Sequence, residues 1–166
     1  MWISFAKTTD ALLIGRKKRT RREWALSHAK KFREGQMVDG YNRNPRNGGI
    51  VVAQVKLLRT PYQQPTRHMT MEDYELEGFA WMTEQGRLYA GLEPLVFFHK
   101  WREADVKLWV VDFELIYLTS AGILRKMEIQ EEQHEREQTA PMGTILSGGD
   151  RPRSNRGYCP MPGLWD

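Results

Sequence analysis

The feature that most constrains the fold is a long alternating segment at residues 107–117. Apolar side chains recur there at every second position: Trp109, Val111, Phe113 and Leu115. Two acidic residues, Asp112 and Glu114, stand between them. A two-residue period gives a β-strand one apolar face. The segment therefore predicts a long strand at the heart of a sheet, on which the rest of the chain must pack.

Shorter patterns before this segment predict a mixed domain of strands and helices. Alternating apolar residues predict strands at residues 3–5, 36–41 and 50–59. Capping residues and apolar spacings of three and four predict helices at residues 9–14, 23–34, 70–86 and 95–101. Turn-forming residues fill positions 42–49, and two prolines bracket a predicted loop at residues 61–65. The predicted fold class is α/β (α+β).

Length and composition indicate one domain with two appended segments. The 166 residues are 40% hydrophobic and 28% charged, which suffices for a single core, and no uncharged apolar run is long enough to span a membrane. We expect a domain over residues 1–122, a charged helical extension over 123–140 and a flexible tail over 141–166. Cys159 is the only cysteine, which excludes an intrachain disulfide and favours a cytoplasmic location.

The positive charge of the chain is concentrated in one block. Although the net charge is only +4, six cations fall within seven positions: Arg16, Lys17, Lys18, Arg19, Arg21 and Arg22. Much of the compensating acid lies far away, within residues 128–137. This distribution indicates a phosphate-bearing partner. The alternative is a solvated basic loop with no ligand.

Several classes of site find no support in the sequence. The four histidines are widely separated and a single cysteine cannot build a structural zinc site, so we expect no metal and no cofactor. A phosphate-cradling glycine loop is absent, and so is the Gly-x-Ser-x-Gly nucleophile motif. The familiar hydrolase and nucleotide-binding classes therefore lose support.

A set of ordered motifs resembles the ASCH domain, a member of the PUA-like group of small β-barrels. Gly-x-Lys-x-x-Thr-x-Arg occupies residues 15–22 and follows Ile-Ser-Phe at residues 3–5. Gly-Gln-Met-Val at 35–38, the strand at 51–57, the Glu-Gly-Phe helix at 69–79 and the aromatic segment at 101–113 follow in the family's order. The resemblance spans residues 1–118 and implies a small PUA-like β-barrel with surrounding helices.

The resemblance also implies a cleft in which Lys17, Thr20 and Arg22 meet Glu77. In family members that hydrolyse N4-acetylcytidine, the corresponding Lys, Thr and Glu are the proposed catalytic set, and other members bind or cut single-stranded RNA. A lysine withdrawn from water can deprotonate a hydroxyl, while a carboxylate can orient an amide or move a proton. The alternative is structural, with Lys17 and Glu77 forming an ion pair that locks loop to helix.

We therefore predict that the basic loop and cleft bind a nucleic acid, RNA or a modified nucleoside, with no membrane partner. The predicted contacts are Lys17, Lys18, Arg19, Thr20, Arg21, Arg22 and Tyr41. If the loop is extended around Thr20, then Thr20 and Arg22 face the cleft while Arg19 and Arg21 face phosphates. Three further aromatic residues are candidates for base stacking: Tyr62, Trp81 and Tyr89.

Two alternatives remain beside nucleic-acid binding. One is a hydrolase, either an amidohydrolase acting on N4-acetylcytidine or a ribonuclease acting on single-stranded RNA, with Lys17, Thr20 and Glu77 as catalytic residues. The other is a protein-interaction module that uses the acidic segment at residues 128–137.

Overall fold

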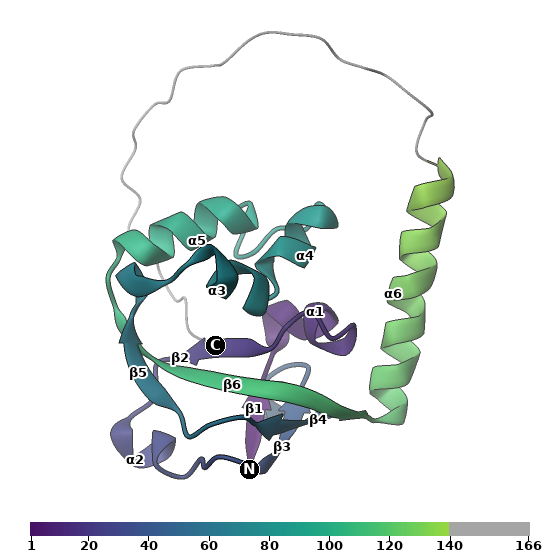
Figure 1. Cartoon of the computed structure of the whole chain (residues 1–166). Helices are drawn as coiled ribbons and strands as arrows, with labels where there is room; N and C mark the ends of the chain where they lie inside the picture. The colour runs from purple at the N-terminus through teal and green to yellow at the C-terminus, as the bar shows by residue number, and fades with distance from the viewer. Residues whose placement is uncertain (140–166) are drawn as a thin grey trace, which may run out of the picture.

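The computed structural model of the protein describes residues 1–139 (Figure 1). The strands are β1 (Trp2–Ser4), β2 (Arg19–Arg22), β3 (Met37–Tyr41), β4 (Val51–Leu57), β5 (Tyr62–Pro65) and β6 (Lys107–Leu118). The α-helices are α1 (Thr9–Leu13), α2 (Leu26–Ala29), α3 (Met71–Leu76), α4 (Phe79–Glu84), α5 (Pro94–Glu103) and α6 (Ser120–Thr139), with 3-10 turns at Ala6–Thr8, Pro45–Asn47 and Thr66–His68. The tail predicted at residues 141–166 lies outside the described residues.

The six strands form one curled sheet that closes into a half-barrel. Its order is β1-β3-β4-β6-β2, and β5 also pairs with β6. Only the β1–β3 pair is parallel. Residues 113–118 of β6 pair with β4, whereas its first half lies between β2 and β5. The prediction of a long strand at the centre of the sheet is confirmed, and so is the mixed α/β class.

The helices pack around this sheet in two groups. Helices α3, α4 and α5 gather above the sheet in the view of Figure 1, while α6 stands at one end of it against α1 and β4. Helix α6 covers the charged segment that the sequence predicts as helical. Within residues 1–139, no helix combines the length and the apolar character needed to cross a membrane. The buried core between the groups contains Ile3, Phe5, Leu12, Val55, Phe79, Phe98 and Phe113.

The predicted helix at residues 23–34 is wrong in its extent, and the loop at 61–65 is a strand. Only Leu26–Ala29 is helical, because Ala25 is extended and β2 continues to Arg22. The apolar spacing reflects packing instead, since the Trp24 ring stacks on Phe32 with 4.5 Å between centroids. Pro65 is tolerated as the last residue of β5, where it pairs with Lys107 at the start of β6.

The predicted helix at 70–86 is divided in two by Gly78. Thr70 and Asp73 form the predicted capping box at the start of α3. Gly78 then adopts a left-handed φ of 85°, which glycine tolerates best. A Cβ added at this position would lie 2.7 Å from the Cβ of Ala11 and 3.3 Å from that of Lys17. The close packing expected at Gly78 is confirmed, and it brings the end of α3 against α1 and the segment that follows it.

Candidate functional site

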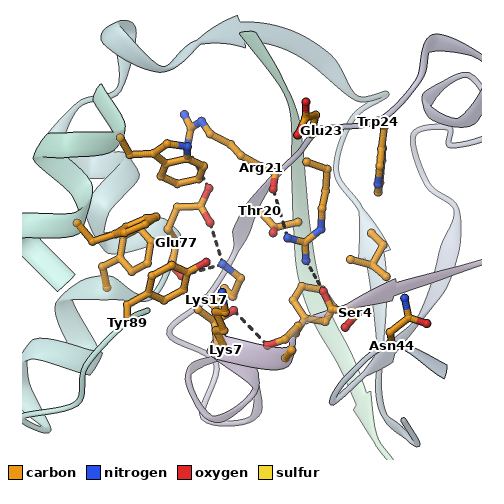
Figure 2. Close-up of a pocket in the computed structure, with 18 of the residues that line it drawn as sticks. Ser4, Lys7, Lys17, Thr20, Arg21, Glu23, Trp24, Asn44, Glu77 and Tyr89 are labelled. Carbon is orange, nitrogen blue, oxygen red and sulfur yellow. Dashed lines mark hydrogen bonds and ion pairs between the residues drawn. The ribbon is translucent and has the colours of Figure 1, made fainter. Parts of the chain in front are cut away.

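A cavity of about 280 Å³ opens between the first strand, the basic block and the α3–α5 group (Figure 2). Figure 2 shows Lys17, Glu77 and Tyr89 on one side of it, Ser4, Trp24 and Asn44 on the other, and Thr20 between them. Four cationic side chains and two carboxylates line this space: Lys7, Lys17, Arg21, Arg22, Glu23 and Glu77. The cavity therefore combines an excess of positive charge with aromatic walls.

Lys17 and Glu77 form a buried pair at one side of the cavity. The Lys17 Nζ donates to the Glu77 carboxylate and to the Glu77 main-chain carbonyl, each at 2.8 Å. Both side chains are at most 3% exposed. Burial lowers the pKa of Lys17, and the nearby Glu77 carboxylate opposes this effect. The resemblance implied that these two residues meet, and the geometry shows that they do.

Glu77 is also tied to Arg21, which links it to a longer run of alternating charges. Arg21 donates to Glu77 at 3.0 Å and to Asp73 at 2.6 Å, and its side chain is fully buried. The run, called here the buried charge chain, contains Arg59, Asp112, Arg19, Asp73, Arg21, Glu77 and Lys17. Each anion lies between two cations, so every interior charge of the chain is compensated on both sides.

Arg19 and Arg21, which the sequence predicts to face phosphates, are both paired with carboxylates inside the protein. Arg19 donates to Asp73 and to Asp112, both at 2.5 Å. Burial acts to lower the pKa of Arg19, but hydrogen bonds to the two carboxylates outweigh it and raise the pKa. The positive charge of both arginines is therefore already neutralised inside the protein. The reason is their register in β2, which turns both side chains toward acidic residues of α3 and β6.

Thr20 lies in the middle of β2, opposite Val111 of β6. Its side chain is 1% exposed and lines the cavity. No residue in the described part of the chain forms a hydrogen bond with its hydroxyl. A buried hydroxyl normally has a partner. The Thr20 hydroxyl can therefore form a hydrogen bond with a ligand in the cavity.

Arg22 differs from the other arginines of the block because it has no carboxylate partner among residues 1–139. Its guanidinium donates to the main-chain carbonyls of Ser4 and Arg21 while lining the cavity. Burial lowers the pKa of Arg22, and Tyr89 and Glu77 act in the opposite direction. The Ser4 hydroxyl beside it is buried and has no partner in the described part of the chain. This part of the wall can therefore receive an anion.

Aromatic side chains close the cavity on both sides. Tyr89 packs edge-on against Phe79, with 5.0 Å between ring centroids, and lies tilted against Phe97, with 4.4 Å between centroids. Burial raises the pKa of Tyr89 to about 12, and the Lys7 ammonium lies 5.6 Å from its ring centroid. Trp24 faces this group from the far side of the cavity (Figure 2). A flat aromatic ligand between these walls would find ring faces and edges to pack on.

Several predicted contacts lie outside the cavity. Lys18 is exposed and does not line it. Tyr41 contacts Trp2 edge-on but is not part of the wall. Tyr62 lies under Arg59, and Trp81 is buried beside Arg87. Of the predicted aromatic residues, only Tyr89 reaches the cavity.

The sequence analysis missed the residues of the first strand and of the segment after β2. Ser4 and Trp2 alternate with the buried Ile3 and Phe5, which is a signal that could have placed them on the face opposite the core. The apolar spacing of residues 23–34 predicts Trp24 on a helix and gives no indication that it lines the cavity. The sequence marks Asp73 as a capping residue and Asp112 as a polar position of a strand, but it does not mark them as partners of Arg19 and Arg21, because those contacts span long sequence separations.

No three histidine, cysteine or acidic side chains gather into a metal-binding group within residues 1–139. Comparison with models of known protein families, with curated protein sequences and with solved structures found no match. The chemistry of the cavity therefore rests on its own geometry. It offers Arg22 and Lys7, which have no carboxylate partner among residues 1–139, and the hydroxyls of Ser4 and Thr20, which have no hydrogen-bond partner there. It also offers a buried lysine–glutamate pair and aromatic walls.

Proposed function

We propose that this protein binds RNA or another single-stranded nucleic acid, or a modified nucleoside, by receiving one base in the cavity. The observation that carries the proposal is Arg22, a cation without a carboxylate partner that lines a cavity with aromatic walls. A group of this kind attracts an anion, and aromatic side chains stack on bases. A nucleotide supplies both partners in one molecule.

The size and polarity of the cavity support the same ligand class. Its volume of about 280 Å³ lies at the lower limit of pockets that hold drug-sized ligands, which favours a single base or nucleoside. Thr20, Ser4 and Asn44 line the space with groups that can hydrogen-bond to the edge of a base. Unpaired bases are recognised by this combination of edge contacts and stacking.

The curled half-barrel and the meeting of Lys17, Thr20, Arg22 and Glu77 at one cavity also support, as part of this proposal, an ASCH-like fold of the PUA-like group. The role of the basic block changes, however. Arg19 and Arg21 are neutralised by Asp73, Asp112 and Glu77, so phosphates meet Arg22 and Lys7 at the cavity instead. Lys17 then serves to hold Glu77 in place against the base.

The proposal is tested with Arg22→Gln and a matched control, Lys18→Gln. Both changes remove one cation from the same block, but only Arg22 lines the cavity. Binding of a fluorescent single-stranded RNA of mixed sequence is followed by anisotropy at several salt concentrations. We expect Arg22→Gln to weaken binding about tenfold or more, because charge-assisted hydrogen bonds to a buried group are lost. Equal affinities of the two variants, or no binding by the wild type, would refute it.

A hydrolase is the second candidate, and the presence of Thr20 and Lys17 in the wall of one cavity favours it. Thr20 has a hydroxyl without a protein partner, and burial lowers the pKa of the lysine that lines the same cavity. When Thr20 attacks the acyl carbon, Lys17 in its neutral form can accept the hydroxyl proton and pass it to the N4 amine as the C–N bond breaks, while Glu77 orients the amide. Water then hydrolyses the acyl ester on Thr20 and releases acetate. Incubation with N4-acetylcytidine or labelled RNA then yields product, and Thr20→Val reduces turnover about a hundredfold or more with little loss of affinity.

A further inference from the structure

We propose that the mouth of the cavity holds a second nucleotide, whose base stacks on Trp2, so that the ligand is an oligonucleotide rather than a free nucleoside. This inference rests on the proposed function, since it assigns a second base position beside the first. The side chain of Trp2 is 43% exposed although it lines the cavity. A large aromatic side chain that is exposed at the entrance of a basic cavity is suited to a planar ligand.

The backbone places Trp2 beside the anion-attracting part of the wall. Side chains alternate along β1, so Ile3 enters the core while Trp2 and Ser4 share the opposite face. The Ser4 carbonyl accepts a hydrogen bond from Arg22. Two residues of strand separate Trp2 from Ser4 by roughly 7 Å, a distance that one nucleotide of an extended strand can bridge. A phosphate at Arg22 therefore leaves the neighbouring base within reach of the Trp2 ring.

The Trp2 ring is held in position from behind. Tyr41 of β3 contacts it edge-on, with 5.8 Å between ring centroids and an interplanar angle of 63°. The two strands are hydrogen-bonded in parallel, with Ser4 opposite Tyr41 and Trp2 opposite Asp39. A ring supported on its edge loses little conformational freedom when a base stacks on its face. This contact also gives Tyr41 a role, as a support for Trp2 rather than as a base contact of its own.

Cations near the same entrance can hold the backbone of a continuing strand. Asn44 lines the cavity, and Arg43 and Arg46 flank it in the chain. Both arginines are exposed and neither forms an ion pair with a residue in the described part of the chain. Lys7 lines the cavity and is likewise exposed. These charges differ from those of Arg19 and Arg21 in that no acidic side chain neutralises them.

The inference predicts that longer oligonucleotides bind more tightly than mononucleotides, and that Trp2 causes this difference. Affinities are measured for mixed mononucleotides and for random single-stranded hexanucleotides, as RNA and as DNA. The variants are Trp2→Ala, Trp2→Phe and a control, Tyr117→Ala, which removes an exposed aromatic side chain of β6 that does not line the cavity. We expect hexanucleotides to bind more tightly than mononucleotides, and Trp2→Ala to weaken hexanucleotide binding about tenfold or more.

The mononucleotide affinity of Trp2→Ala should equal that of the wild type, and Trp2→Phe should restore most of the hexanucleotide affinity because it retains a stacking face. Hexanucleotides that bind no more tightly than mononucleotides, or a Trp2→Ala variant indistinguishable from Tyr117→Ala, would overturn the second position while leaving the proposed function intact. Failure of the wild type to bind any of the probes would instead overturn both. A hexanucleotide advantage confined to RNA would identify the 2′-hydroxyl as a contact.

Discussion

Among the ion pairs of residues 1–139, two larger groups use similar residue types but differ in burial. The first is the buried charge chain, in which the Arg21 side chain is fully buried and those of Asp73 and Glu77 are each 3% exposed. The second group, called here the α6 charge cluster, joins α6 to α1 and to the segment after α4: Asp10, Arg87, Arg125, Glu128 and Glu132. In that cluster the side chain of Arg125 is 35% exposed and that of Glu132 41%.

Because of this difference in burial, the ion pairs of the two groups contribute differently to stability. Removing one member of a buried pair leaves its partner without water and without a counter-charge, which is costly. Removing one member of an exposed pair returns its partner to water, which costs little. The buried charge chain therefore fixes the position of Glu77 at the cavity. The α6 charge cluster adds only modest attachment to a helix that already contacts α1 and β4.

The largest effect is expected from Arg21→Leu, in the middle of the buried charge chain. The change leaves Asp73 and Glu77 buried with one counter-charge fewer, so the free energy of unfolding should fall by about 3–5 kcal/mol. Urea denaturation followed by circular dichroism measures it. Arg59→Ala is the matched control, because Arg59 ends the same chain with a side chain that is 52% exposed. A loss as large for Arg59→Ala as for Arg21→Leu would show that burial does not govern the effect.

An intermediate loss in the free energy of unfolding is expected when acid protonates Asp73. Burial acts to raise its pKa, but hydrogen bonds from Arg21 and from the Thr70 amide outweigh burial and lower it. Ionised Asp73 therefore stabilises the fold above the pKa of about 3.9 that it has in the unfolded chain. This contribution disappears as the pH falls through the lower folded value.

Two variants, one in the buried charge chain and one in the α6 charge cluster, compare how the stability of the protein depends on pH in each group. Unfolding free energies are measured between neutral pH and acid for Asp73→Asn and for Asp10→Asn. Hydrogen bonds from Arg125 and Arg87 also lower the pKa of Asp10, although burial opposes them. Because the side chain of Asp10 is more exposed than that of Asp73, Asp73→Asn should flatten the acid side of the profile more. Identical profiles of unfolding free energy against pH for the two variants would contradict the proposed effect of burial.

The strands were predictable from the sequence where a local period determines them. The alternation in residues 107–117 anticipates β6 because one face of that strand packs on the core. By contrast, β5 carries Pro65 and too few apolar residues for a period, and its pairing with β6 is a long-range contact. The helix expected at residues 23–34 failed because Trp24 and Phe32 pack together without a helical backbone between them.

The candidate site was predictable only in part, because charge in a sequence does not reveal burial. Lys17, Thr20 and Glu77 do reach one cavity, as the family resemblance implied. The pattern of the basic block suggested an exposed surface, whereas five of its six cations contact protein acceptors. The acceptors Asp73 and Asp112 lie more than fifty residues away from Arg19 in the chain. No local pattern encodes such pairings.

The smallest effect is expected from Arg125→Ala in the α6 charge cluster. Arg125 contacts Asp10, Glu128 and Glu132, but Asp10 and Glu132 both keep Arg87 as a partner and remain partly accessible to water. We expect the free energy of unfolding to fall by about 1 kcal/mol or less, and the difference from wild type to shrink further as salt is added. The same urea titration, repeated at low and high ionic strength, measures both. A loss of unfolding free energy comparable to that of Arg21→Leu, or one that persists at high salt, would contradict this expectation. It would mean that the attachment of α6 depends on these ion pairs and that solvent exposure does not weaken the ion pairs.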